Sequence, residues 1–251
     1  MVLHIPHSSI EIPEKYREIF LISDEELKDE ILKMTDLYTD DLFDFSDNRV
    51  VFGLSRLLCD VERFRNPLKE EMTDAGMWIC YSRAHDGRCL KEFEGDHIGE
   101  MLKEYDRHHE KLTVAVEHEI EAKGACLLID CHSFSSVRLP YETCGAGVRP
   151  DICIGTNDFH TPEWLSAGLK KGFENLGYTV AMNYPFSGTI VPMKYYRKND
   201  AVHSIMIEVN RSLYMDEKSG EKSLDYQKVK ANIRSAMETA LRTPTADGNA
   251  A

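Results

Sequence analysis

The sequence predicts an α/β fold with a mostly parallel or mixed central sheet and helices on both of its faces. Short apolar segments of strand length alternate with longer segments in which apolar residues recur every three or four positions. Strands that are connected through helices usually pair in parallel and are covered on both faces. With 251 residues, 42% of them hydrophobic and 29% charged, the chain is long enough for one domain with a sizeable core. We expect that domain over residues 1–241 and a disordered tail over residues 242–251.

Four segments have the spacing of helices. They cover residues 24–45, 96–123, 161–176 and 226–241. Ser23 followed by Glu26 is typical of a capping box at the start of the first segment, and Gly124 is a typical stop after the second. Thr161 as a cap, with Pro162 in the first turn, favours the start of the third.

Apolar segments of strand length lie before, between and after these helices. They are a short segment that begins at Val2 and residues 49–60, 125–130, 151–156, 178–184 and 203–210. The segment at 49–60 has the character of extended chain, interrupted near Gly53. Residues 65–95 mix Pro, Gly and charged residues without a clear period, so we interpret them as a long irregular excursion of the kind that often covers a site.

Composition excludes several classes of partner. The 43 acidic and 30 basic residues give a formal net charge of -13, which argues against binding to nucleic-acid phosphates or to an anionic membrane surface. No apolar run approaches the roughly 20 residues that are needed to cross a bilayer. The seven cysteines form no Cys-x-x-Cys pair and follow no secretory signal, which favours reduced thiols. We therefore expect a cytoplasmic protein whose partner is a small molecule, and the sequence carries no signal for its oligomeric state.

Three polar residues lie where strands are expected to end. His7 comes after the first strand, His132 follows the segment at 125–130, and Glu208 lies near the end of the segment at 203–210. Because ligands bind at the carboxyl ends of parallel strands, we expect these side chains to converge. Two imidazoles can hold a zinc ion, and a nearby carboxylate can act as the base that activates water. The alternative is that each histidine is an ordinary capping or solvated side chain.

Glu208 is the most informative single residue. It follows Ile205, Met206 and Ile207, where an unpaired buried carboxylate would be costly. It must therefore have a partner or face a cleft. The alternative is that it lies at a strand edge or pairs with Arg211.

Arginines near residue 60 could bind an anionic substrate. Arg56 and Arg63 flank Asp60, and Glu62 lies beside Arg63. A guanidinium on the same rim could hold a substrate carboxylate through two parallel hydrogen bonds. A surface ion-pair cluster is the alternative.

The segment NYPFSGTIVP combines Asn183 and Gly188 with aromatic residues and prolines. It could close over a substrate, or it could be an ordinary turn, and turns are commoner. We include Asn183, Gly188 and Arg211 with Arg56 and Arg63 among the expected substrate contacts.

Helical spacing leads to different predictions for three other polar residues. On the helix at 96–123, His109 fits the apolar stripe whereas His108 points away, so His109 is interpreted as a hydrogen-bonded core histidine. If the predicted helix at 24–45 is uninterrupted, Asp36 lies opposite its apolar stripe and is solvated. It reaches a metal only if that helix breaks near Thr35.

Six short segments occur in the order seen in the N-formylglutamate amidohydrolase family. They are HIPHSSIEIP, MTDLYTDDLF, SRLLCDVERF, LLIDCHSFSS, NYPFSGTI and IMIEVNRSLYM, and they run from about His4 to Met215. Each segment alone is weakly specific, but six in order are hard to obtain by chance. The family's fold is similar to that of the zinc carboxypeptidases, so the resemblance implies a zinc-exopeptidase-like fold.

The resemblance also implies roles for individual residues. His132 resembles a zinc ligand, Arg63 a carboxylate clamp and Glu208 the general base, and His7 is implied as the first metal ligand. Carboxypeptidases take a further ligand from a glutamate three residues after the first histidine, but that position is Ile10 here. The set of metal ligands is therefore incomplete from the motif alone.

Two assignments stay open at this point. Asp36 is our choice for the third metal ligand, and Glu11 and Glu62 are alternatives. In the zinc carboxypeptidases the residue beside the arginine is typically Asn, and Glu62 in its place would repel a dicarboxylate unless another arginine compensates. Three arginines are candidates for stabilising the oxyanion, namely Arg56, Arg83 and Arg197.

The function that the resemblance implies is metal-dependent hydrolysis of the amide bond of an N-acyl amino acid similar to N-formylglutamate, in amino acid catabolism. Zinc is the expected cofactor, although imidazole and carboxylate ligands also suit manganese, iron or cobalt. Three alternatives remain on the same fold. They are a zinc carboxypeptidase, a deacylase of another N-acyl amino acid, and a non-catalytic module that binds amino acids.

Overall fold

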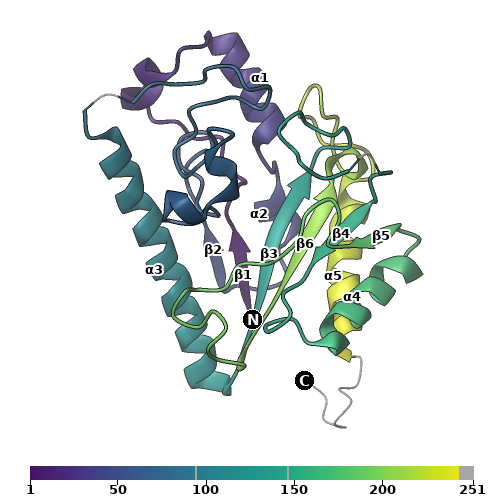
Figure 1. The fold of residues 1–251 in the computed structure, drawn as a ribbon. Coiled ribbons are helices and arrows are strands. Elements are labelled where there is room, and N and C mark those ends of the chain that lie inside the picture. Colours follow the sequence, from purple (N-terminus) through teal and green to yellow (C-terminus); the bar gives the residue numbers. More distant parts are fainter. Residues whose placement is uncertain (94, 146, 243–251) are drawn as a thin grey trace.

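A six-stranded sheet runs through the centre of the computed structural model, which describes residues 1–93, 95–145 and 147–242 (Figure 1). The strands are β1 (Val2–Ile5), β2 (Arg49–Val51), β3 (Cys126–Phe134), β4 (Ile152–Gly155), β5 (Val180–Met182) and β6 (Val202–Asn210). Their order across the sheet is β2-β1-β3-β6-β4-β5. The first four are parallel, whereas β4 is antiparallel to β6 and β5 is parallel to β4. The prediction of a mostly parallel or mixed sheet is therefore confirmed.

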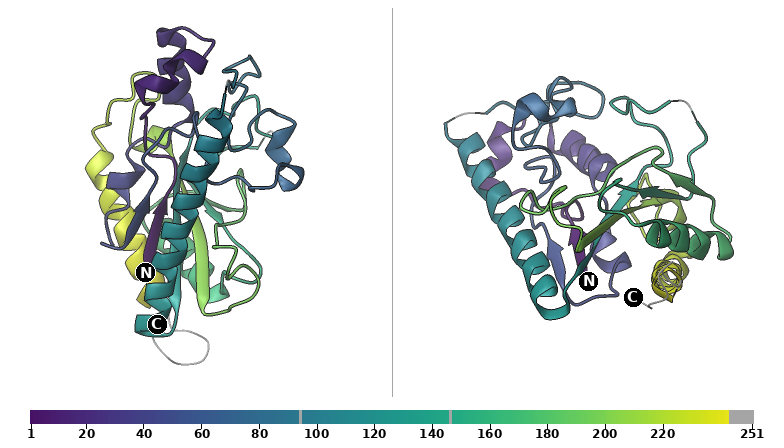
Figure 2. Two further views of the ribbon diagram at one scale, coloured as in Figure 1. Left: turned by 90° about the vertical axis from the view of Figure 1, so that its left-hand side faces the viewer. Right: turned by 60° about the horizontal axis from the view of Figure 1, so that its bottom comes forward.

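Helices cover both faces of this sheet. Within the described residues the α-helices are α1 (Asp24–Met34), α2 (Thr39–Leu42), α3 (His97–Lys123), α4 (Glu163–Asn175) and α5 (Tyr226–Arg242), and short 3₁₀ helices lie at Glu14–Ile19, Pro67–Lys69, Glu71–Thr73 and Arg211–Leu213. Successive side chains of a strand point to opposite faces. Val2 of β1 accordingly packs with Leu112 of α3, whereas Leu3 belongs to the core that includes α2, α4 and α5. Figure 2 shows α3 on the opposite side of the sheet from α5.

The longest strands, β3 and β6, form the centre of the sheet. They pair in register over nine residues each, from Cys126 opposite Val202 to Phe134 opposite Asn210. Both strands are buried on their two faces along almost their whole length, which explains why their sequences are nearly continuous apolar runs. Polar residues near their carboxyl ends are consequently held side by side by backbone pairing.

The predicted helix at 24–45 is two helices. The capping box at Ser23 is present, but α1 ends at Met34, where Thr35 is extended, and α2 begins only at Thr39. Tyr38, just before α2, has φ 69° and lies in the left-handed region, which no continuous helix contains. The break frees Asp36 from the helical surface and lets it turn inward.

Other boundaries differ by smaller amounts. In the segment at 49–60 only β2 is a strand, and at 161–176 the hydroxyl of Thr161 donates a hydrogen bond to the carbonyl of Ser204 instead of capping α4. The stop at Gly124 is present, with φ 79°. The last helix continues to Arg242, and residues 243–251, most of the expected tail, lie outside the described residues.

The irregular excursion forms a layer above the carboxyl ends of β1 and β3 (Figure 1). It has an apolar core of its own, to which Leu57, Ile79 and Tyr81 contribute together with Met34 of α1 and Tyr105 of α3. This layer closes the edge of the sheet at which the polar strand ends lie. Among the described residues, no helix combines the length and the apolar character that a membrane crossing requires.

Candidate active site

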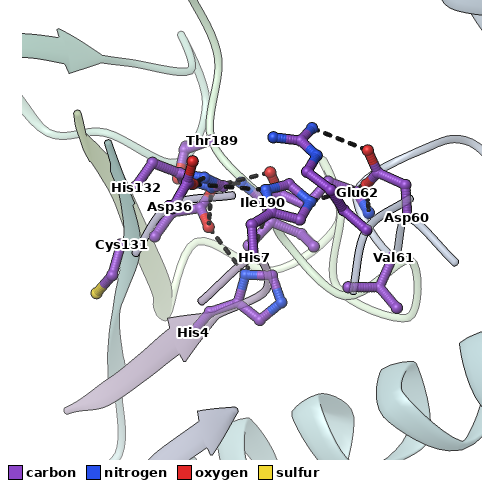
Figure 3. Close-up of polar contacts among 12 residues, drawn as sticks. His4, His7, Asp36, Asp60, Val61, Glu62, Cys131, His132, Thr189 and Ile190 are labelled. Atoms are coloured by element: carbon purple, nitrogen blue, oxygen red, sulfur yellow. Dashed lines mark hydrogen bonds and ion pairs between the residues drawn. The ribbon is translucent and has the colours of Figure 1, made fainter. Parts of the chain in front are cut away.

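The ends of three parallel strands bring the main candidate residues together. His132 of β3 lies directly opposite Glu208 of β6 in the strand register, and His7 follows β1. The imidazole rings of His7 and His132 have centroids 5.2 Å apart. The structure therefore gathers these three residues at one edge of the sheet, as Figure 3 shows for the two histidines.

A cavity of about 290 Å³ opens over this edge. Its lining includes many of the residues singled out by the sequence, namely His7, Asp36, Arg56, Glu62, Arg63, His132, Glu208 and Arg211. The excursion and the segment after β3 supply further lining, including Tyr141 and Glu142. The cavity is thus polar, with both signs of charge, in a protein whose overall charge is strongly negative.

Three of these residues form a compact set of metal-ligating atoms. His7, Asp36 and His132 are all buried, and each offers one ligand atom within 4.8 Å of the others. Asp36 Oδ2 lies 3.6 Å from His7 Nδ1 and 3.0 Å from His132 Nδ1 (Figure 3). His7 Nδ1 is buried and has no hydrogen-bond partner among the described residues. Two imidazole nitrogens and a carboxylate oxygen are a donor set that zinc prefers.

The far side of each imidazole ring is held by a carboxylate. His7 Nε2 lies 2.9 Å from Asp60 Oδ1, and His132 Nε2 lies 3.1 Å from Asp130 Oδ1 and 2.8 Å from Glu62 Oε2. A carboxylate accepts a hydrogen bond from the N–H of one ring nitrogen, which leaves the lone pair on the other nitrogen. Both rings therefore turn Nδ1 towards Asp36, as ligation of one ion requires.

Asp36 is fixed in its ionised form by its surroundings. Burial opposes ionisation, but the hydrogen bond with His132, the nearby ring of His7 and the charge of Arg211 hold the pKa of Asp36 well below its usual range. Arg211 Nη2 donates to Asp36 Oδ1 at 2.7 Å, which leaves Oδ2 for the histidines. Arg211 also binds the carbonyl of Ser133, so it holds Asp36 in place and is not the partner of Glu208 that we considered.

Glu208 faces the cavity with an unsatisfied carboxylate. It is 7% exposed, and its Oε2 has no hydrogen-bond partner among the described residues. Burial raises the pKa of Glu208 to about 8, and the negative charge of Asp36 adds to this shift. A carboxyl group in this setting is suited to taking up and giving back a proton.

Arg56 and Arg63 share a single carboxylate. Arg56 Nη2 donates to Asp60 Oδ2 at 2.9 Å, and Arg63 Nε lies 3.4 Å from the same oxygen. Arg63 Nη2 also donates to the hydroxyl of Tyr81 at 3.0 Å. Because one carboxylate, which also binds His7, faces two guanidinium groups, this wall of the cavity has spare positive charge for an anionic substrate.

Glu62 turns away from this wall. Its two carboxylate oxygens lie 2.8 Å from His132 Nε2 and 3.5 Å from His4 Nδ1. Its charge therefore acts on the histidines and not on Arg63, which reduces the repulsion that we expected towards a substrate carboxylate. Glu62 contacts the edge of His132 opposite to Asp36, and Glu11, the other alternative ligand, is exposed.

Several predicted residues lie outside the cavity. Asn183 is exposed and hydrogen-bonds Thr156, and Gly188 packs against Gly155. The reason is strand direction: β5 runs against β6, so its carboxyl end leads away from Glu208. The segment after it returns to the cavity with Pro185, Phe186 and Ser187. Of the arginines considered for the oxyanion, Arg83 binds the carbonyl of Gly87 and Arg197 pairs with Asp158, which leaves Arg56 in the cavity.

Other site residues were not singled out from the sequence. Asp60 and Asp130 hold the two histidines, and His4 contacts Asp130. The period of two along a strand was an available signal, because Asp130 precedes His132 by two residues and so shares its face. Tyr141 lines the cavity, and its hydroxyl makes no hydrogen bond within the described part of the chain. It lies on an irregular segment, where no periodic pattern of residues indicates which side chains face the cavity.

A known protein family and two known structures are similar to this chain. A family model described as N-formylglutamate amidohydrolase matches residues 1–215. The structure is similar to that of N-formylglutamate amidohydrolase from Ralstonia eutropha JMP134, with TM-score 0.79 and 19% identity over 96% of this chain and 93% of that one. A gene product of Agrobacterium tumefaciens is similar with TM-score 0.64 and 19% identity over 94% of this chain and 90% of that one. No curated protein sequence matches the chain. The two structural likenesses show the α/β fold, and the family match over most of the chain shows that this protein belongs to the N-formylglutamate amidohydrolase family.

Proposed function

We propose that this protein hydrolyses the amide bond of an N-formyl amino acid similar to N-formylglutamate, with a zinc ion held by His7, Asp36 and His132. Family membership supports the amidohydrolase reaction on a small molecule. The observation that carries the metal assignment is the shared direction of two imidazole Nδ1 atoms towards Asp36 Oδ2, one of them buried without a partner. Glu208, opposite His132, is the protein group placed to move protons.

A divalent metal in such a site acts as a Lewis acid and makes a water nucleophile available at neutral pH. Glu208 Oε2 accepts a proton from the attacking water and returns it to the amide nitrogen as the bond to the acyl carbon breaks. The products are formate and the free amino acid. Because one carboxylate both accepts and donates the proton, no net change in its protonation remains after the cycle.

The arginines provide binding and charge stabilisation. Arg63, with spare donors on its guanidinium, holds the substrate carboxylate, and Arg56 supplies positive charge for the developing oxyanion. Lys33 lies at the exposed rim of the cavity and offers a second positive charge for a side-chain carboxylate. A dicarboxylic N-formyl amino acid is therefore the preferred substrate in this proposal.

The test combines metal content and hydrolysis in one set of samples. We expect wild-type protein to hold zinc near one equivalent by mass spectrometry and to hydrolyse N-formylglutamate in a panel of N-acyl amino acids. His132→Ala should lose both zinc and activity. His118→Ala, which removes an exposed histidine of α3, is the matched control and should keep both.

The outcomes separate the parts of the proposal. Hydrolysis by wild type without any metal, and without a gain when zinc, manganese, iron or cobalt is added, would refute the metal assignment and leave the family reaction. Full activity of a zinc-loaded enzyme only towards larger acyl groups or peptides would refute the substrate and leave the metal assignment.

A further inference from the structure

We propose that a buried row of side chains, formed by Asp130, His4 and His108, positions the metal ligand His132 from behind and fixes which of its ring nitrogens faces the metal. The proposal rests on the proposed function, because it assigns these residues to the metal site. It adds His4 and His108, neither of which lines the cavity, to the machinery of the enzyme.

The row is continuous and shielded from solvent. His132 Nε2 lies 3.1 Å from Asp130 Oδ1, His4 Nδ1 lies 2.8 Å from the same oxygen, and His4 Nε2 lies 2.9 Å from His108 Nε2. The exposed fractions of these four residues are between 0% and 4%. Figure 3 shows His4 on the strand that approaches His7 and His132. The contacts therefore run without a gap from the cavity to helix α3.

Regular secondary structure fixes each member of the row. His4 of β1 is directly opposite Asp130 of β3 in the strand register, and Asp130 and His132 are two residues apart on one face of β3. His108 comes from the buried stripe of α3 that packs on this face. The prediction that His108 points away is wrong, because His108 is 3% exposed. His109 makes a hydrogen bond as predicted, with the carbonyl of Val61, but it is half-buried and not part of the core.

The hydrogen bonds in the row have one consistent set of directions. The carboxylate of Asp130 only accepts, so His4 Nδ1–H and His132 Nε2–H both donate to Oδ1, and the backbone N–H of Ile190 donates to Oδ2 at 3.0 Å. A neutral His4 then has a lone pair on Nε2, which accepts from His108 Nε2–H. Burial lowers the pKa of His108 to about 2, which keeps its ring neutral. Along this row, His132 keeps its proton on Nε2 and presents the lone pair of Nδ1 to Asp36.

A packing role alone does not account for the row. Apolar side chains of similar shape would fill the space between β1, β3 and α3 without the cost of burying polar groups. His4, Glu62 and Asp130 also offer ligand atoms within 4.8 Å of one another. Those atoms are already engaged with each other or with His132, so we interpret the group as support for the metal site and not as a second one.

The experiment compares two substitutions of the most remote member. The side-chain amide of His108→Gln can still donate a hydrogen bond to His4, whereas His108→Leu cannot. We expect His108→Leu to weaken zinc binding about 10- to 100-fold, the range found when outer partners of metal ligands are removed, and His108→Gln to stay close to wild type. Zinc affinity is measured on the metal-free proteins by competition with a chelator. Ring-nitrogen NMR of the zinc-loaded proteins shows whether His132 is bound through Nδ1.

Controls keep the result interpretable. His118→Leu alters an exposed histidine of the same helix and should bind zinc as wild type does. If His108→Leu does not fold, His108→Asn replaces it, because its amide is too short to reach His4. Equal losses in the glutamine and leucine variants, no loss in either, or two zinc ions per chain would each overturn the proposal. A wild-type protein that binds no zinc would instead defeat the metal assignment itself, and the inference with it.

Discussion

Two buried histidine–carboxylate groups in this molecule differ in how completely their polar atoms are satisfied. In the covering layer, Glu30 of α1 accepts hydrogen bonds from both the ring and the backbone N–H of His85, each at 2.6 Å. In the cavity, His7 Nδ1 and Glu208 Oε2 are buried without partners among the described residues. Buried polar atoms are nearly always paired, so an unpaired one calls for an explanation.

The comparison teaches that burial of a histidine beside an acid does not identify a site. Glu30 and His85 tie helix α1 to the excursion, and the pair is complete as it stands. Lys91, in the same layer, is likewise bonded to the carbonyls of Leu57 and Leu58. Of these groups, the one at the strand ends leaves His7 Nδ1 and Glu208 Oε2 open, among the described residues, to something that the chain does not supply, which is the property of a site.

The largest effect on the rate of hydrolysis is expected from removing the carboxylate of Glu208, the proposed proton-transfer group in the cavity. Glu208→Gln should lower the rate of amide hydrolysis roughly 10²- to 10⁴-fold, the usual contribution of a general acid–base group. Zinc content and folding should be retained, because the amide is similar in shape and carries no charge to bury. Glu163→Gln, at an exposed position of α4, is the control. Activity within tenfold of wild type would show that another group moves the proton.

Disruption of the Glu30–His85 pair should lower the stability of the protein and leave catalysis unchanged. Glu30→Ala leaves the ring and backbone N–H of His85 buried without their acceptor, and a buried donor left without a partner typically costs about 1–3 kcal/mol. Urea unfolding followed by circular dichroism measures this loss. The hydrolysis rate per folded molecule should stay close to wild type. A specific loss of rate, with stability unchanged, would make Glu30 and His85 part of the site.

The sequence was sufficient for the fold and for the residues on the central strands. A strand that is buried on both faces has a short continuous run of apolar residues in its sequence. A polar residue inside such a run, such as Glu208 in β6, is therefore easy to recognise. His132 was visible for the same reason at the end of β3. The order of the six sequence motifs indicated the family.

Features that depend on chain direction or on breaks in regular structure were not predictable. Apolar spacing continues from α1 into α2, so the turn that brings Asp36 inward leaves no trace in the pattern. His108 and His109 both fit the spacing around Tyr105, and only packing on the sheet decides between them. Asn183 was included because its segment could close over a substrate, but β5 runs antiparallel to β6, so the carboxyl end of β5 leads away from Glu208.

The smallest expected effect concerns Lys91, whose ammonium group is buried without an acidic partner among the described residues. Burial lowers the pKa of Lys91 to about 8, while the ordinary value of about 10.5 applies when the chain is unfolded. Between these values the unfolded chain binds more protons than the folded one, so the free energy of unfolding rises with pH. Below pH 8 both states are protonated and the full cost of burying the charge is present.

We therefore expect wild type to gain on the order of 2 kcal/mol between about pH 7.5 and pH 9.5 relative to Lys91→Met, which has no charge to lose. Urea unfolding of the two proteins at both pH values measures the difference, and Lys228→Met, at an exposed position of α5, is the control. Lys91→Met also leaves the carbonyls of Leu57 and Leu58 without a donor, which lowers stability at every pH. The two proteins are therefore compared by how their free energies of unfolding change with pH and not by the absolute values. If the free energy of unfolding changes equally with pH in wild type and in Lys91→Met, Lys91 stays protonated over this whole pH range. The layer above the sheet would then hold a buried charge without an acidic partner, as the cavity holds buried polar atoms without partners.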